Sequence, residues 1–163
     1  MSEQVFLSIG SNLGQRQKNL STAIAAIQEN SAIVNVKQAS IYETEPLYYA
    51  DQPAFLNTVI GLEATCQPLE LLGFTAGLEE DSGRRPDRKK NLPRALDIDI
   101  LCWGDRILNH KNLVIPHPDL QNRRFVLIPW AEIAADFLVS KWNMTVHELL
   151  SVCVDSSQVN EYN

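Results

Sequence analysis

The sequence predicts an α+β domain in which an antiparallel sheet packs against two helices. Three observations predict it: apolar residues alternate in four segments, they recur at helical spacing in two others, and the segments follow the order strand, helix, strand, strand, helix, strand. This βαββαβ order is typical of the ferredoxin-like fold. Because 163 residues provide enough chain for one core but not for two ordinary ones, we predict a single domain over residues 1–163.

The first half of the pattern runs from residue 5 to residue 44. Val5 to Ile9 form a short apolar strand, and the turn GSNLG at 10–14 is expected to supply a capping side chain for the following helix. One apolar stripe marks that helix, formed by Leu20, Ala23, Ile24 and Ile27. IVNVKQ and IYET then alternate like one strand that continues, with room for a bend, to about Thr44.

The second half repeats the pattern and adds a C-terminal region. Phe55 to Glu63 alternate as a third strand, and a second helix is expected from Pro68 to an end at Gly83. The fourth strand is expected from Ala95 to Trp103. Further on, TVHELLSV has the capping box of a short helix, and the polar chain after Cys153 is expected to fray.

Composition and charge exclude several classes of protein. The chain is 45% hydrophobic with a net charge of -6, which argues against a general nucleic-acid binder or a protein of anionic membranes, because both need a basic face. No apolar run is long enough to span a membrane. The N-terminus has no secretion signal, and three cysteines without metal-type spacing fit buried thiols in a reducing compartment. We therefore expect a cytoplasmic protein.

Two aspartates stand out in the segment PRALDIDI. Because strand side chains alternate, Asp97 and Asp99 are expected on one face, about 6 to 7 Å apart at the backbone, while Leu96, Ile98 and Ile100 face the core. Paired carboxylates suit a hard cation, above all Mg²⁺, whose other ligands come from water and phosphate. The alternative is an exposed edge strand whose aspartates form salt bridges.

Two loops are longer or more charged than the fold requires. The segment Glu45 to Ala54 exceeds a simple hairpin loop, and long loops of compact domains are often functional. The segment GRRPDRKKNLPR, which leads into the aspartate strand, carries six basic residues against one acid. It is either a solvated charge run or an anion site, and a basic loop next to metal-binding carboxylates is the combination that phosphoryl transfer needs.

Four further residues are candidates with a structural alternative. His117 lies between two prolines and Asn57 is on the inward face of the third strand, so each could bind a ligand or satisfy the backbone. Phe55 and Phe125 could hold a flat heterocycle between them, although each taken singly also fits the core.

Four motifs occurring in order give a resemblance to a known family. LSIGSNLG, DQPAFLNTV, PRALDIDIL and IPHPDLQNRRFVLIP together resemble the 6-hydroxymethyl-7,8-dihydropterin pyrophosphokinase family over about residues 5–134. The resemblance implies transfer of the β,γ-diphosphate of ATP to a reduced pterin, with release of AMP and two Mg²⁺ ions bound. We expect these two small molecules to be the partners, with no nucleic acid or membrane, and the protein to be a monomer.

The resemblance also implies roles for individual residues. Asp97 and Asp99 match the metal ligands and, with Arg84 and Arg94, the catalytic group. The implied pterin site comprises Thr44, Glu45, Leu47, Phe55, Asn57 and Phe125. The implied ATP site comprises Glu79, Arg94, Ile100, His117 and Arg123.

The chain departs from the family pattern in the basic loop. Where the family usually has Arg-Trp-Gly-Pro-Arg, this chain has Lys90, Asn91, Leu92, Pro93 and Arg94. The tryptophan that helps to close the loop is therefore missing. Three hypotheses follow: an active pyrophosphokinase with a modified loop, a pterin-binding or regulatory paralogue with weakened transfer, and a metal or nucleotide module with another acceptor. The co-occurrence of all four motifs favours the first.

Overall fold

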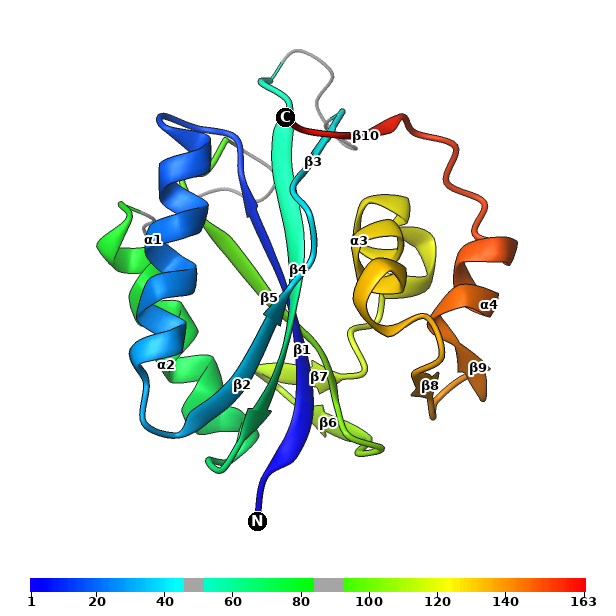
Figure 1. Ribbon diagram of the computed structural model, residues 1–163. Coiled ribbons are helices and arrows are strands. Elements are labelled where there is room, and N and C mark those ends of the chain that lie inside the picture. Colours follow the sequence, from blue (N-terminus) through cyan, green and yellow to red (C-terminus); the bar gives the residue numbers. More distant parts are fainter. Residues whose placement is uncertain (46–51, 84–92) are drawn as a thin grey trace.

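The computed structural model describes residues 1–45, 52–83 and 93–163 (Figure 1). Within these residues a six-stranded sheet has the order β10-β3-β4-β1-β5, with β2 also pairing with β4, and all of these pairings are antiparallel. The strands are β1 (Glu3–Ser11), β2 (Ile33–Gln38), β3 (Tyr42–Thr44), β4 (Phe55–Ala64), β5 (Asp97–Trp103) and β10 (Val159–Glu161). The predicted antiparallel sheet with helices packed on it is confirmed at this level.

Helices α1 (Arg16–Glu29) and α2 (Pro68–Asp81) cover one face of the sheet (Figure 1). The predicted stripe of α1 is buried there, and the inward residues of the strands complete this core. Leu96, Ile98 and Ile100 belong to the same core, as the alternation around the two aspartates predicted. Gly83, predicted to end α2, has a φ of +106°, a conformation that glycine adopts without strain.

Helix α3 (Arg124–Ala134) covers the opposite face, and α4 (Val146–Val152) packs against α3 (Figure 1). Phe6 and Val59 pack from the sheet against Trp130 of α3, with the Phe6 and Trp130 rings 5.4 Å apart. We did not predict α3, because Pro129 lies inside it and proline usually interrupts a helix. The capping box of α4 is confirmed by mutual hydrogen bonds between Thr145 and Glu148.

Three local predictions are wrong. The second strand is divided into β2 and β3, and Asn35 within β2 has a φ of +55° where the register with β4 shifts. The turn before α1 supplies no side-chain cap, since the N-cap residue is Gln15 and its side chain makes no capping hydrogen bond. The chain after Cys153 does not simply fray, because β10 adds an edge strand to β3.

Short elements complete the described structure. They are β6 (Leu108–His110), β7 (Leu113–Ile115), the 3₁₀ turn η1 (Leu120–Asn122), β8 (Leu138–Val139) and β9 (Met144–Thr145). The three cysteines are all free, but only Cys102 is fully buried. Among the helices in the described ranges, none combines the length and apolar character that a membrane crossing requires.

Candidate active site

The strand register gathers the predicted polar site residues on the α3 side of the sheet. Gly10 of β1 lies opposite Asn57 of β4 and Asp97 of β5, and Ser8 lies opposite Asp99. Directly opposite residues of antiparallel strands place their side chains on the same face. Asn57, Asp97 and Asp99 therefore share one face around the end of β1, with only the glycine between the amide and the first carboxylate.

Cationic and imidazole groups surround the two carboxylates. Nη1 of Arg94 lies 2.9 Å from Oδ1 of Asp97, while Oδ2 of Asp99 lies 3.5 Å from Nη1 of Arg123 and 3.9 Å from Nε2 of His117. Burial, followed by the charge of Asp97, raises the pKa of Asp99 well above its usual range, although Arg123 and Arg94 oppose the shift. The carboxylate pair is thus held close enough for mutual repulsion, which a bound cation would relieve.

The donor set fits magnesium better than a self-contained metal site. Among residues 1–45, 52–83 and 93–163 there is no group of three or more His, Cys, Asp or Glu that could hold an ion alone. Two carboxylates on one strand face provide hard oxygen ligands and leave the remaining positions to water and phosphate, which is how Mg²⁺ is usually bound at nucleotide sites. A structural zinc ion would need four protein ligands. Asp97 and Asp99 are the residues that would hold the ion.

Glu79 and Ile100 lie beside the aspartate strand in different ways. Oε2 of Glu79 on α2 accepts a 2.8 Å hydrogen bond from the backbone N–H of Ile98, so it covers the free edge of β5. The Ile100 side chain is buried in the core under α1 and α2, on the opposite face from the aspartates. Any contact of Ile100 with a nucleotide must therefore come from its main chain, and that role stays a prediction.

His117 is held as a neutral hydrogen-bond donor. Its backbone N–H donates to the carbonyl of Leu101 at 2.9 Å, and its Nδ1 accepts from the backbone N–H of Asp119 at 3.1 Å. The accepting Nδ1 places the ring proton of the neutral imidazole on Nε2, the atom that faces Asp99. Burial, with a further contribution from Arg123, lowers the pKa of His117 to about 4, so the ring carries no charge at neutral pH.

This lowered pKa predicts an acid-sensitive contribution of His117 to stability. Between pH 6.5 and 4 the unfolded chain protonates His117 and the folded chain does not, so the contribution of His117 to the free energy of unfolding falls as the pH decreases through this window. We expect a loss of about 1–2 kcal/mol near pH 5 from this residue. Urea unfolding of metal-free wild type and His117→Asn near pH 7 and pH 5 measures it as the difference between the two proteins, because the raised pKa of Asp99 acts in the opposite direction in both. Equal pH dependence in both proteins would contradict this assignment.

Asn57 and Gly10 form the second part of the site. Asn57 is 4% exposed, and its Nδ2 donates to Oγ1 of Thr44 at 2.9 Å. A Cβ added at Gly10 would lie 2.5 Å from Oδ1 of Asn57 and 3.5 Å from Cδ1 of Phe55. The missing side chain at Gly10 is therefore what allows the buried amide to lie against β1. The sequence showed only a turn glycine at this position.

The aromatic candidates lie on two elements that face each other across this side of the sheet. Phe55 begins β4 and pairs with Thr44, whereas Phe125 is in the first turn of α3, which packs over β4. Both rings are partly buried, and the Arg123 guanidinium lies 5.8 Å from the centroid of the Phe125 ring. Phe125 thereby links the aromatic part of the site to the cluster around Asp99.

Asn12 is a functional candidate that the sequence reading missed. It is 1% exposed, its backbone N–H donates to the carbonyl of Arg94 at 2.9 Å, and its Oδ1 accepts from the Arg94 N–H at 2.7 Å. Its Nδ2 donates to Oε1 of Gln52 and to the carbonyl of Pro53. Asn12 thus holds the backbone of Arg94, whose side chain lies beside Asp97. It also holds Gln52 and Pro53, which precede β4. Its position in a polar turn was the only available signal.

Some predicted residues are not placed in the site. Arg84 and Leu47 lie outside the described residues, as do Lys90, Asn91 and Leu92 of the altered motif. Glu45 is exposed, just after β3. The roles predicted for Arg84, Leu47 and Glu45 therefore stay predictions.

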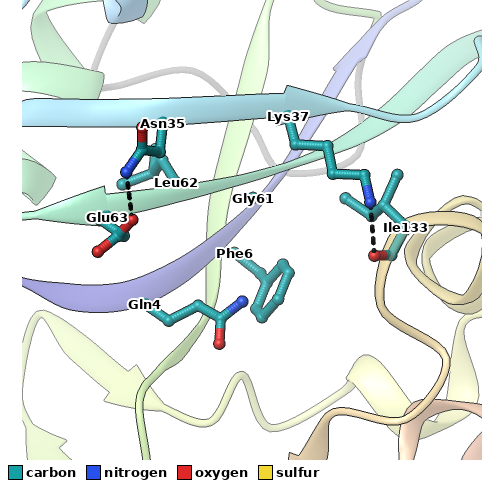
Figure 2. A pocket seen from close by; sticks show the side chains of 8 residues that line it. All are labelled: Gln4, Phe6, Asn35, Lys37, Gly61, Leu62, Glu63 and Ile133. Carbon is teal, nitrogen blue, oxygen red and sulfur yellow. Dashed lines mark hydrogen bonds between the residues drawn. The ribbon is translucent and has the colours of Figure 1, made fainter.

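A separate hollow lies further along the same face of the sheet (Figure 2). It has a volume of about 360 Å³ and is lined by Gln4, Phe6, Asn35, Lys37, Gly61, Leu62, Glu63 and Ile133. Nζ of Lys37 donates to the carbonyl of Ile133 at 3.4 Å, and Asn35 donates to Glu63 (Figure 2). These polar groups bind one another, and the hollow contains none of the predicted site residues.

Comparison with known proteins identifies relatives of this chain. The family model for 7,8-dihydro-6-hydroxymethylpterin-pyrophosphokinase matches residues 6–135. The 2-amino-4-hydroxy-6-hydroxymethyldihydropteridine pyrophosphokinase of Bacillus subtilis is 37% identical over 133 residues, covering 82% of this chain and 79% of the relative. The protein of that name from Haemophilus influenzae is 34% identical over 154 residues, covering 94% of this chain and 95% of the relative.

A solved structure supports the fold independently of sequence. The Plasmodium falciparum HPPK-DHPS crystal structure with pteroate matches with a TM-score of 0.73 at 14% identity, covering 93% of this chain and 42% of that one. The family match extends over most of the chain. The chain belongs to the 7,8-dihydro-6-hydroxymethylpterin-pyrophosphokinase family.

Proposed function

We propose that this protein transfers the β,γ-diphosphate of ATP to the hydroxymethyl group of 6-hydroxymethyl-7,8-dihydropterin and releases AMP, as a step of folate synthesis. The observation that carries the proposal is the family match over residues 6–135. Bacterial relatives of similar length bear the pyrophosphokinase name. ATP and the reduced pterin are the proposed partners, and we propose that the protein acts as a monomer, without nucleic acid or membrane.

The acidic cluster is the proposed diphosphate-transfer centre. Asp97 and Asp99 would hold Mg²⁺, two ions being expected from the family, and bound Mg²⁺ would neutralise charge on the phosphate oxygens. Arg94 and Arg123 already lie beside these carboxylates and would turn to the phosphates, with Arg84 as a further predicted cation. Because positioning and charge neutralisation account for most catalysis of phosphoryl transfer, the site requires no covalent intermediate.

The buried amide and the two phenylalanines form the proposed pterin site. Phe55 and Phe125 would enclose the flat ring, and Asn57 would read its polar edge. The Thr44 hydroxyl accepts one Nδ2 proton of Asn57 and so limits rotation of the amide, which supports specific recognition. Glu45 and Leu47 would complete the lining.

The proposed ATP site surrounds the His117 ring and the outer edge of β5. Glu79, Arg94, Ile100, His117 and Arg123 are the proposed contacts. His117 would donate from Nε2 as a neutral group, because its pKa is lowered to about 4 by burial. A neutral donor can bind a phosphate or hydroxyl oxygen without adding charge to a cluster that already contains two arginines.

The fold is proposed to be ferredoxin-like. The order β5-β1-β4-β3 in the sheet, with α1 and α2 on one face, supports this arrangement. In this sheet β4 carries Asn57, and the edge strand β5 carries Asp97 and Asp99, toward the helices added on the other face.

A pterin-binding paralogue without efficient transfer is the alternative, and it rests on the altered loop sequence around Asn91 and Leu92. The proximity of Asp97 to Arg94 and of Asp99 to His117 supports the transferase instead. The names of the bacterial relatives also favour the enzyme.

Product analysis distinguishes these possibilities. The protein is incubated with ATP, Mg²⁺ and 6-hydroxymethyl-7,8-dihydropterin, and the nucleotides are separated. We expect AMP that depends on the pterin and disappears with EDTA or in Asp97→Ala. ADP as the product would indicate transfer of a single phosphoryl group, and pterin binding without AMP would favour the paralogue.

Replacing Phe125 with alanine should weaken pterin binding. Loss of one ring face is expected to cost about 1 kcal/mol or more, which is about a fivefold increase in the pterin Kd. Fluorescence titration with the pterin measures it. Phe137→Ala is the matched control, because Phe137 packs on Phe6 in the second core and should affect stability alone. An unchanged Kd for Phe125→Ala would place that ring in the core.

A further inference from the structure

The segment that follows α4 lies beyond the family match, which ends at residue 135. After Val152 the chain does not leave the molecule but returns across it to the edge of the sheet, where β10 pairs with β3 (Figure 1). We name residues 155–162 the C-terminal brace. Its contacts include α3, β3 and, through Arg16, the start of β4, which carry the proposed pterin site.

The first contact of the brace is with the start of α3. The first amides of a helix have no partner within the helix, and the N-cap residue of α3, Arg123, provides no side-chain cap. Oδ2 of Asp155 accepts from the Arg124 N–H at 3.0 Å, while its Oδ1 accepts from the Ser157 N–H at 2.9 Å. A carboxylate 31 residues away in sequence therefore caps the helix next to Phe125.

The second contact is with β3. Val159 lies opposite Thr44, which on its other side lies opposite Phe55 of β4. Tyr162 extends this pairing by donating its N–H to the carbonyl of Ile41 at 2.8 Å. The brace thus supports the outer side of a three-residue strand whose Thr44 hydroxyl orients the Asn57 amide.

The third contact reaches the start of β4 through Arg16. The Arg16 guanidinium lies 5.9 Å from the centroid of the Tyr162 ring, and its Nη1 lies 2.8 Å from Oε2 of Glu43 and 2.9 Å from the carbonyl of Ala54. Ala54 immediately precedes Phe55. The end of the brace is therefore joined to the element that carries the other phenylalanine.

We infer that the C-terminal brace positions the two walls of the pterin site, with Asp155 as the positioning residue on the α3 side and β10 on the Thr44 side. The brace itself would touch no substrate. It joins α3, β3 and the start of β4, so the separation of Phe125 from Phe55 and the orientation of Asn57 depend on it. The inference rests on the proposed function, since it assigns these walls to the pterin.

Steady-state kinetics of the wild-type protein and two variants test the brace. One variant is Asp155→Ala, and a second ends at Ser157 and so lacks β10. We expect each to raise the pterin KM about threefold to tenfold, the effect of one or two lost hydrogen bonds, and to leave the ATP KM within about twofold. The ATP side should be spared because Asp99 and Asp119 hold the Arg123 side chain independently. Asp155→Asn keeps one acceptor oxygen and should fall between wild type and Asp155→Ala.

The control is Asp136→Ala, which removes an exposed carboxylate just beyond the other end of α3 and should leave both KM values unchanged. The inference would be overturned if the pterin KM were unchanged in the truncated variant and in Asp155→Asn. It would also be overturned if the KM values for pterin and ATP rose equally. Both outcomes can be measured even if Asp155→Ala fails to fold. Wild-type turnover with AMP release would then still support the proposed function. Wild-type protein that neither binds the pterin nor releases AMP would overturn both.

Discussion

Asp97→Asn should release AMP at least about a hundredfold more slowly than wild type, because the site would lose one anchoring charge for a cation expected to provide several kcal/mol of transition-state stabilisation. Folding should be nearly unaffected. Asparagine keeps an acceptor oxygen for Arg94, which lies 2.9 Å from Asp97 in the wild type, and the substitution removes repulsion with Asp99. We expect the free energy of unfolding to stay within about 1 kcal/mol of wild type.

Rapid-quench measurement of AMP together with urea unfolding separates the two effects. Asp105→Asn is a suitable control, because Asp105 is an exposed aspartate just beyond the other end of β5. It should leave the rate unchanged. Near wild-type turnover in Asp97→Asn, or loss of cooperative unfolding, would remove Asp97 from the metal site.

Gly10→Ala should raise the pterin Kd at least about tenfold. The new methyl group would lie 2.5 Å from Oδ1 of Asn57 and 3.5 Å from the Phe55 ring, so the amide that is proposed to read the pterin would have to move. Thr44 holds the other end of that amide, which leaves little freedom for relief. Crowding of this kind also costs about 1–3 kcal/mol of stability.

Gly61→Ala provides the matched control for Gly10→Ala. Gly61 lies on the same face of the sheet beside the hollow of Figure 2, and an added Cβ would lie 3.0 Å from Cε1 of Phe6. It should reduce stability by a similar mechanism and leave the pterin Kd unchanged. Equal losses of affinity in both variants would show that general destabilisation, and not displacement of Asn57, explains the result.

The alternation of side chains allowed one face of the site to be predicted from sequence. Once Leu96, Ile98 and Ile100 were assigned to the core, the period of two in a strand required Asp97 and Asp99 to lie together on the other face. The third strand was predicted in the same way, with Leu56 and Ile60 on the face opposite Asn57. The local pattern was sufficient to assign these faces because alternate residues of a strand pack into different cores on the two sides of the sheet.

Residues that act through long-range pairing could not be predicted. Asn12 contacts Arg94, 82 residues away, and Gly10 has its role because Asn57 of another strand lies against it. Neither contact leaves a periodic signal. The helix α3 was missed because it contains Pro129, and proline usually interrupts a helix. Packing of α3 on Phe6 and Val59 overrides this local preference. Strand β10 was missed because its polar sequence has no apolar alternation, and its pairing with the edge strand β3 depends on residues far away in the sequence.

A crystal structure with Mg²⁺ and a non-hydrolysable ATP analogue tests the central claim most directly. We expect density for an ion that carboxylate oxygens of both Asp97 and Asp99 bind, with Arg94 and Arg123 turned toward phosphate oxygens. A nucleotide complex in which Asp97 still pairs with Arg94 and Asp99 with Arg123, and in which the metal lies elsewhere, would contradict the proposed centre.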